Sequence, residues 1–204
     1  MKWRQISKGS AGLPGAGTYR DWKVLLSQEG FHQCVYCTID EPSFGGLRNF
    51  HVEHYKPKSR FPLLENDFNN LFLACGICNS FKGNDWPADP SPMHDACAYP
   101  CPAEIDYAQY IRVNSDTGEV SGTTLAMRYV IERLYLNRPQ LLLDRRVSLA
   151  LSAINSYREY FRGALDSVDD LALLRKICRR LDDLIELHQQ LKEALPYAAG
   201  DVAR

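Results

Sequence analysis

The amino-acid sequence predicts a mostly helical α+β fold, in which a small core held by four cysteines precedes a helical C-terminal region. Two Cys-x-x-Cys pairs, at residues 34–37 and 75–78, mark the small core. From residue 123 onward, apolar residues recur at helical spacing. The 204 residues therefore divide into four expected parts: an arm with a short helix (1–30), the four-cysteine core (31–86), a proline-rich linker with a small hairpin (87–122) and the helical region (123–204).

Local signals give the elements in chain order. Thr18 is a candidate N-cap for a short helix over 19–28, and residues 50–54 read as a strand. The apolar spacing of residues 69–82 predicts a helix, whereas five prolines between residues 87 and 102 exclude regular structure there. The remaining expected elements are a hairpin over 107–121 and three helices over 123–136, 138–165 and 168–195.

The last expected helix carries a heptad seam, in which steps of three and four residues alternate. Its members are Leu174, Ile177, Leu181, Leu184, His188, Leu191 and Leu195. Such a seam predicts either helix packing within the chain or a coiled contact with another chain, and both readings remain open at this point.

The composition is that of a soluble globular protein, with 45% hydrophobic and 24% charged residues and a net charge of −1. No apolar run approaches the ~20 residues that cross a bilayer. The first residues lack an apolar signal core, so we expect a cytoplasmic protein. Because DNA-binding modules are usually basic, any grip on nucleic acid must be local or shared with a partner. The local candidates are Lys56, Lys58, Arg60 and Lys82.

Four paired cysteines are candidate ligands of a structural Zn²⁺ ion: Cys34, Cys37, Cys75 and Cys78. Two knuckles of this spacing supply the four thiolates of a closed tetrahedral site. A reducing compartment favours metal binding over disulfides, and no βαβ pattern supports a redox pair. Cys97 and Cys101 form a looser cluster with His94, for which free or packing thiols fit better than a second zinc site because no fourth ligand is evident.

The peptide held by these cysteines carries the side chains of a hydrolytic metal site. Glu53 and Asn79 offer carboxylate and amide oxygens, which suit a hard divalent ion. The imidazole of His54 can deprotonate water near neutral pH. Strand alternation would place His51 beside Glu53, so His51 is either a third ligand, a phosphate contact or a structural hydrogen-bonding residue.

The residues from Glu53 to Lys82 resemble the HNH endonuclease family, whose ββα-metal motif consists of a strand, a loop, a second strand and a helix. They read E-H-x-x-P, then N-N-L, then C-x-x-C-N-x-x-K. The resemblance implies that His54 is the general base and that Glu53 and Asn79 bind a catalytic Mg²⁺ or Mn²⁺ ion. It also implies that Asn70 braces the loop carrying the base and that Lys82 lies near the scissile phosphate. This sequence has Glu where the family more often has Asp before the base.

Residues 51–62 and 68–71 resemble a narrower branch, the HNH nucleases of Septu-type and retron-associated anti-phage systems, and 116–120 and 134–146 carry weaker echoes. That likeness implies DNA cleavage in defence, together with a partner ATPase of the ABC/SMC-like class, for which residues 168–195 are a candidate docking surface. Two alternatives remain: a zinc-stapled binding module with a degenerate site, and a stand-alone nicking or homing-type nuclease. The sequence leaves open the choice of DNA or RNA, the sequence specificity and the trigger.

Overall fold

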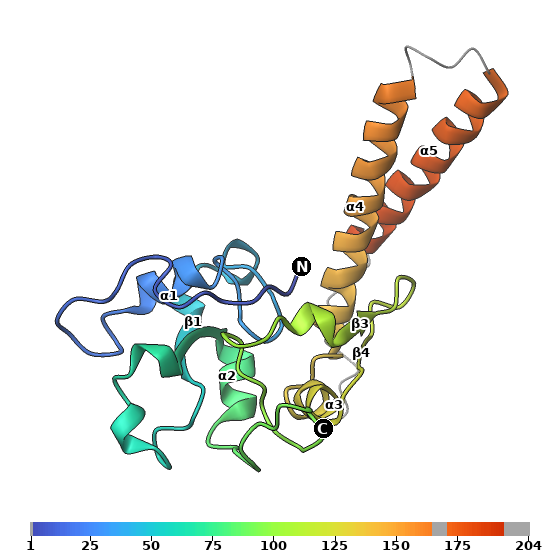
Figure 1. The fold of residues 1–204 in the computed structure, drawn as a ribbon. Helices are drawn as coiled ribbons and strands as arrows, with labels where there is room; N and C mark the ends of the chain where they lie inside the picture. The colour runs from blue at the N-terminus through green and yellow to red at the C-terminus, as the bar shows by residue number, and fades with distance from the viewer. Residues whose placement is uncertain (1, 165–170, 194–204) are drawn as a thin grey trace. The chain divides into compact units, whose positions relative to one another are not determined.

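In a computed structural model of the chain, residues 2–164 and 171–193 are described. They form two compact units (Figure 1). The first comprises the chain up to residue 114 together with 119–141, and the second comprises 115–118 and the residues from 142 onward. Small two-stranded sheets and long terminal helices confirm the expected mixed, largely helical fold class.

The first unit contains two antiparallel strand pairs and three helices. Strand β1 pairs with β2 so that Glu53 lies opposite Phe72 and His54 opposite Leu71. Strands β3 and β4 form the expected hairpin. The elements of this unit are α1 (Lys23–Glu29), β1 (Phe50–His54), β2 (Leu71–Cys75), α2 (Gly76–Lys82), β3 (Ile111–Val113), β4 (Val120–Gly122) and α3 (Leu125–Arg133).

The helix expected over residues 69–82 is wrong in its first half. Leu71–Cys75 is the strand β2, and all five of its residues are buried. A fully buried apolar run has no polar face from which a period can be read, so pairing with β1 decides its conformation. The helix α2 starts only at Gly76, where the Sγ atom of Cys75 accepts a hydrogen bond from the Cys78 amide at 3.5 Å.

Helix α1 begins at Lys23 rather than at residue 19. The side chain of Asp21 accepts hydrogen bonds from the backbone amide and hydroxyl of Thr18, at 2.8 and 3.1 Å. These bonds close a turn ahead of the helix, so Thr18 does not cap α1 itself.

The proline-rich segment wraps the core of the first unit. The buried ring of Trp86 packs edge-on against Tyr55, with centroids 5.0 Å apart. The carboxylate of Asp85 accepts hydrogen bonds from Tyr99, at 2.8 Å, and from Tyr129 of α3. Helix α3 is thereby tied to the four-cysteine core, within the first unit that continues to residue 141.

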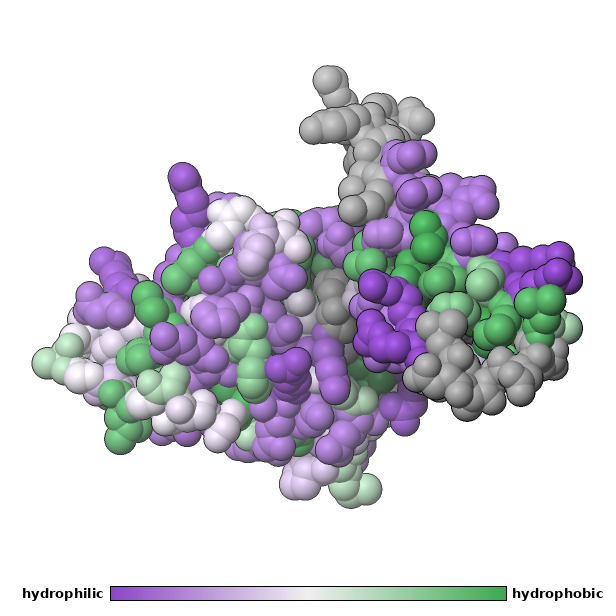
Figure 2. All heavy atoms as spheres, turned by 90° about the horizontal axis from the view of Figure 1, so that it is seen from above, coloured by the Kyte–Doolittle hydropathy of each residue, from purple (hydrophilic) through white to green (hydrophobic). Residues whose placement is uncertain are grey.

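The second unit is an antiparallel pair of helices, α4 (Pro139–Ala164, which begins in the first unit) and α5 (Leu171–Glu193) (Figure 1). Ile177, Leu184 and Leu191 of the seam are buried, so the seam packs within the chain, while Leu195 lies outside the described residues. Figure 2 shows hydrophobic side chains exposed on this pair at the right of the view. The exposed ones include Leu151, Tyr160, Leu171, Ile185 and Leu187. None of the helices in the described part of the chain combines the length and apolarity that a membrane span requires.

Candidate active site

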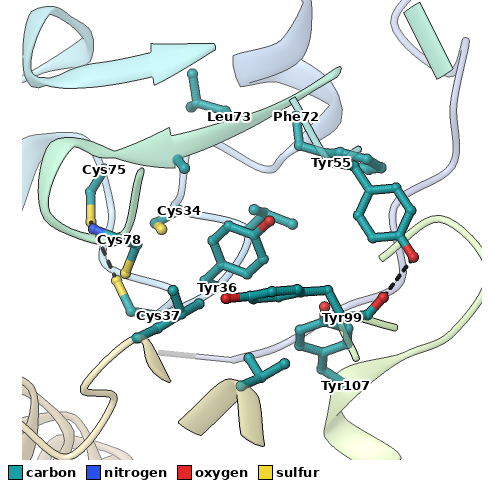
Figure 3. Close-up of a cluster of buried hydrophobic side chains, with 14 of the residues drawn as sticks. Cys34, Tyr36, Cys37, Tyr55, Phe72, Leu73, Cys75, Cys78, Tyr99 and Tyr107 are labelled. Atoms are coloured by element: carbon teal, nitrogen blue, oxygen red, sulfur yellow. Dashed lines mark hydrogen bonds between the residues drawn. The ribbon is translucent and has the colours of Figure 1, made fainter. Parts of the chain in front are cut away.

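The two Cys-x-x-Cys pairs converge on one point in the first unit (Figure 3). All four side chains are fully buried, and their sulfur atoms all lie within 4.8 Å of one another. The Sγ atoms of Cys37 and Cys75 are 3.7 Å apart. A tetrahedral ion with metal–sulfur bonds of about 2.3 Å places its sulfurs about 3.8 Å apart. The four sulfurs therefore fit a structural Zn²⁺ ion.

This cluster joins segments that are distant in the sequence. The first knuckle contacts β2 through the Val35 amide, which donates to the Leu73 carbonyl at 2.9 Å. Cys75 ends β2 and caps α2, so an ion at the cluster would tie the knuckle to the junction of strand and helix. Burial raises the pKa of the Cys34 thiol, so ionisation of this thiol requires a compensating cation.

A cavity of about 470 Å³ opens beside β1. It brings together the four residues that the sequence offers for a hydrolytic metal site, His51, Glu53, His54 and Asn79. The other lining residues are Tyr19, Arg20, Lys23, Phe50, Val52, Pro57, Lys58, Gly83 and Asn84. Strand β1 and the middle of α2 thus present a carboxylate, two imidazoles and an amide to the same space.

The half-buried ring of His54 is held in one orientation. Its Nε2 atom lies 3.0 Å from the carbonyl oxygen of Glu65. Because a carbonyl only accepts hydrogen bonds, we assign the ring proton to Nε2, which leaves the lone pair of the neutral imidazole on Nδ1. Burial lowers the pKa of His54, which favours the neutral ring near pH 7. The Tyr19 ring packs edge-on against it, with centroids 4.8 Å apart.

The carboxylate of Glu53 is buried, with only 3% of its side chain exposed. The Nζ atom of Lys82 lies 2.5 Å from Oε1, and the Tyr36 hydroxyl donates to the same oxygen at 3.4 Å. Burial raises the pKa of the Glu53 carboxyl, and the charge of Lys82 acts in the opposite direction. His51 differs from Glu53 in being exposed, although both line the cavity.

Lys82 does not lie where the resemblance placed it. Its side chain has no exposed area, and Nζ also donates to the His54 carbonyl oxygen at 2.9 Å. A buried carboxylate is strongly destabilised unless a counter-ion accompanies it, and Lys82 supplies that charge to Glu53. Lys82 is therefore an internal partner of Glu53, and it does not line the cavity.

Asn70 lies just before β2 and bridges to the loop that follows His54. Its Oδ1 atom accepts from the Lys56 amide at 2.8 Å. Its Nδ2 atom donates to the carbonyl oxygens of Lys56 and Leu64, at 3.0 and 3.2 Å. The side chain thus holds both arms of this loop, and it does not line the cavity.

Three cavity residues come from the N-terminal segment and were not identified by sequence reasoning: Tyr19, Arg20 and Lys23. The Tyr19 hydroxyl accepts hydrogen bonds from Arg20 and Lys58, at 3.2 and 3.0 Å, and these bonds lower the pKa of Tyr19. No local motif marks residues 19–23, because tertiary packing alone brings them beside His54. Lys58, by contrast, belongs to the basic cluster that the sequence did indicate.

The thiols of the looser cysteine cluster differ in burial. Cys97 is exposed and Cys101 is buried. Within residues 2–164 and 171–193, the four core cysteines are the one group of three or more histidine, cysteine or acidic side chains placed to share an ion.

Comparison with known proteins supports this geometry. Residues 34–85 match the family model described as HNH endonuclease, which spans the first knuckle through α2 and so includes both the cysteine cluster and His54. The chain is also 36% identical over 63 residues to the Septu protein PtuB of Bacillus thuringiensis. That match covers 30% of this chain and only 23% of the relative's length. Residues 34–85 therefore form a domain of the HNH endonuclease family, as their motif predicted.

Proposed function

We propose that the chain is a metal-dependent endonuclease that hydrolyses phosphodiester bonds in DNA. The observation that carries the proposal is the convergence of His54, Glu53 and Asn79 on one cavity inside the HNH domain. Because Nε2 of the imidazole lies against a backbone carbonyl, Nδ1 is the ring atom left to accept a proton.

His54 acts as the general base and takes a proton from the attacking water through Nδ1. Glu53 and Asn79 would hold a hard divalent ion, Mg²⁺ or Mn²⁺, with the exposed His51 as a possible further ligand. When bound, such an ion supplies positive charge that stabilises the phosphate and the leaving oxygen in the transition state. Asn70 holds the loop after His54 and so keeps the base in place.

Positively charged side chains at the cavity bind the phosphate backbone locally, although the chain has a net charge of −1. Arg20, Lys23 and Lys58 line the same cavity as the proposed base. Contacts of this kind fix the position of DNA without reading its sequence. We therefore expect cleavage with little intrinsic sequence preference.

Substituting Lys58→Gln is expected to weaken DNA binding to the same extent on unrelated sequences. Losing one phosphate contact reduces the slope of log affinity against log salt by about 1. Fluorescence anisotropy with labelled duplexes over a salt series measures both quantities. Lys2→Gln, which removes an exposed lysine that does not line the cavity, is the matched control. Equal slopes for the wild type and Lys58→Gln would contradict a phosphate contact at this position.

The likeness to the Septu protein PtuB supports a more specific role, that of the nuclease effector of an anti-phage defence system acting with an ABC/SMC-like ATPase. A nuclease that shares its hold on DNA with a partner need not be basic overall. The exposed apolar side chains of α5, Leu171, Ile185 and Leu187, are candidate contacts for that partner. Co-purification of the two proteins tests the proposed ATPase partner separately. The wild type is compared with an α5 variant in which these three residues are changed to Gln.

Cleavage of supercoiled plasmid DNA tests the enzymatic proposal. The purified chain, alone and together with the product of a neighbouring ATPase gene, is incubated with Mg²⁺, with Mn²⁺ and with EDTA. We expect nicked and linear products with either ion and none with EDTA. DNA binding without cleavage under every condition would instead support a binding module, and strong cleavage by the chain alone would support a stand-alone nuclease.

A further inference from the structure

Arg138 places a guanidinium group against the cysteine cluster, within the first unit. Its Nη1 and Nη2 atoms each lie 3.8 Å from the Sγ atom of Cys78. The side chain is partly buried, and the Nε atom is buried without a hydrogen-bond partner. Among the described residues, no carboxylate forms a salt bridge with Arg138, and its guanidinium instead contacts the Cys78 sulfur.

The chain after α3 is shaped so that Arg138 reaches this position. Tyr135 adopts a left-handed conformation, with φ of 49°, between the fully buried Leu134 and Leu136. The Tyr135 ring packs against Phe81 of α2, with centroids 5.0 Å apart. The Arg138 guanidinium also donates to the carbonyl oxygens of Leu134 and Tyr135, at 3.4 and 3.3 Å. A backbone conformation that is unfavourable for tyrosine thus turns the chain back onto the core.

The negative charge of the cysteine cluster explains why a guanidinium group beside it is stabilising. Four thiolates around one Zn²⁺ ion carry a net charge of −2, and all four cysteine side chains are fully removed from solvent. Charge in such surroundings is costly unless it is paired and hydrogen-bonded. Groups outside the ligand shell that donate to a ligand also orient it and strengthen metal binding.

We propose that Arg138 is a positioning residue of the zinc site, which donates N–H groups to the Cys78 thiolate and retains the ion by offsetting its negative surroundings. The proposal rests on the assignment of Zn²⁺ to the four cysteines. It gives the turn after α3, which lies outside the matched HNH segment, a direct role in maintaining the nuclease core.

Three variants test this role: Arg138→Gln, Arg138→Lys and, as a matched control, Arg133→Gln. Arg133 belongs to the same segment but is bound to Asp85 and contacts no sulfur. Zinc per chain is measured by elemental analysis, and the rate of zinc transfer to a colorimetric chelator is followed over time. In Co²⁺-substituted protein, the sulfur-to-metal charge-transfer band reports the electron density on the thiolates.

We expect Arg138→Gln to release zinc about tenfold faster or more than the wild type, with a shifted charge-transfer band, because lost outer-shell partners weaken metal sites by that order. Arg138→Lys keeps the charge and loses the planar guanidinium, so its zinc release rate should lie between those of the wild type and Arg138→Gln. Arg133→Gln should release zinc at the wild-type rate. Arg138→Lys carries the comparison if Arg138→Gln does not fold. Wild-type release rates and band positions in the Arg138 variants would overturn the role of Arg138 alone. A wild-type protein that binds neither Zn²⁺ nor Co²⁺ would overturn the zinc assignment and this role together.

Discussion

The His54→Ala protein is expected to lose metal-dependent plasmid nicking, with a rate about 10² to 10⁴ times lower than that of the wild type, because general-base catalysis contributes that range. The reason is local: His54 lines the cavity and its Nε2 is held by the Glu65 carbonyl, which leaves Nδ1 to accept a proton. Single-turnover cleavage of plasmid DNA in Mg²⁺ and in Mn²⁺ measures the loss.

The fold should survive this substitution. His54 is only partly buried, and its ring makes one hydrogen bond and one edge contact with Tyr19. Loss of a hydrogen bond of this kind costs about 0.5–1.5 kcal/mol, which a folded domain tolerates. Zinc content and circular dichroism should therefore match the wild type.

Two further variants make the result specific. His54→Gln retains an amide that can donate to the Glu65 carbonyl but has no group that accepts a proton near neutral pH, so it should be as inactive as His54→Ala. His32→Ala removes a histidine whose side chain is largely exposed and does not line the cavity. This variant should cleave DNA at the wild-type rate. Wild-type rates in either His54 variant would show that the base lies elsewhere or that a contaminating nuclease is being measured.

The features that the sequence predicts correctly are those encoded by short spacings. Each Cys-x-x-Cys knuckle is local, and the strand Phe50–His54 lies in a stretch bounded by turn signals, so both could be identified without tertiary information. The seam of α5 repeats over several turns and correctly indicates a long helix. The strand Leu71–Cys75 could not be identified from periodicity, because all of its side chains are buried.

The site was predictable only as far as the motif reaches. His51, Glu53, His54 and Asn79 do line one cavity, but sequence order does not reveal that Lys82 is fully buried against Glu53. The motif specifies residue types at given intervals, whereas the counter-ion of a buried carboxylate is decided by packing. Tyr19 and Arg20 illustrate the same limit, since α1 packs near β2 through contacts between distant parts of the chain.

Loss of the cysteine cluster should have the largest effect on stability. In the Cys75→Ser protein we expect loss of zinc and of the cooperative thermal transition of the first unit. Structural zinc contributes about 10–16 kcal/mol of apparent binding free energy in small zinc domains, which exceeds or matches the total stability of about 5–15 kcal/mol typical of a domain. Differential scanning calorimetry with elemental analysis measures both effects.

Cys97→Ser is the matched control, because Cys97 is exposed and lies outside the cluster. A surface substitution of this kind changes stability by less than about 0.5 kcal/mol, so its transition should coincide with that of the wild type. Unchanged melting of Cys75→Ser, or normal melting of the wild type after complete zinc removal, would show that the apolar core suffices and that the cluster does not staple the fold.

The two large effects separate catalysis from scaffolding. Cys75 touches no substrate, yet it ends β2, caps α2 and lies opposite Phe50 at the start of β1, so its loss displaces the elements that carry His54 and Asn79. We therefore expect Cys75→Ser to lose nicking together with the fold, whereas His54→Ala loses nicking with the fold intact. A Cys75→Ser protein that still cleaved DNA at the wild-type rate would mean that the cavity holds its geometry without the ion, and the cysteine cluster would then need another explanation.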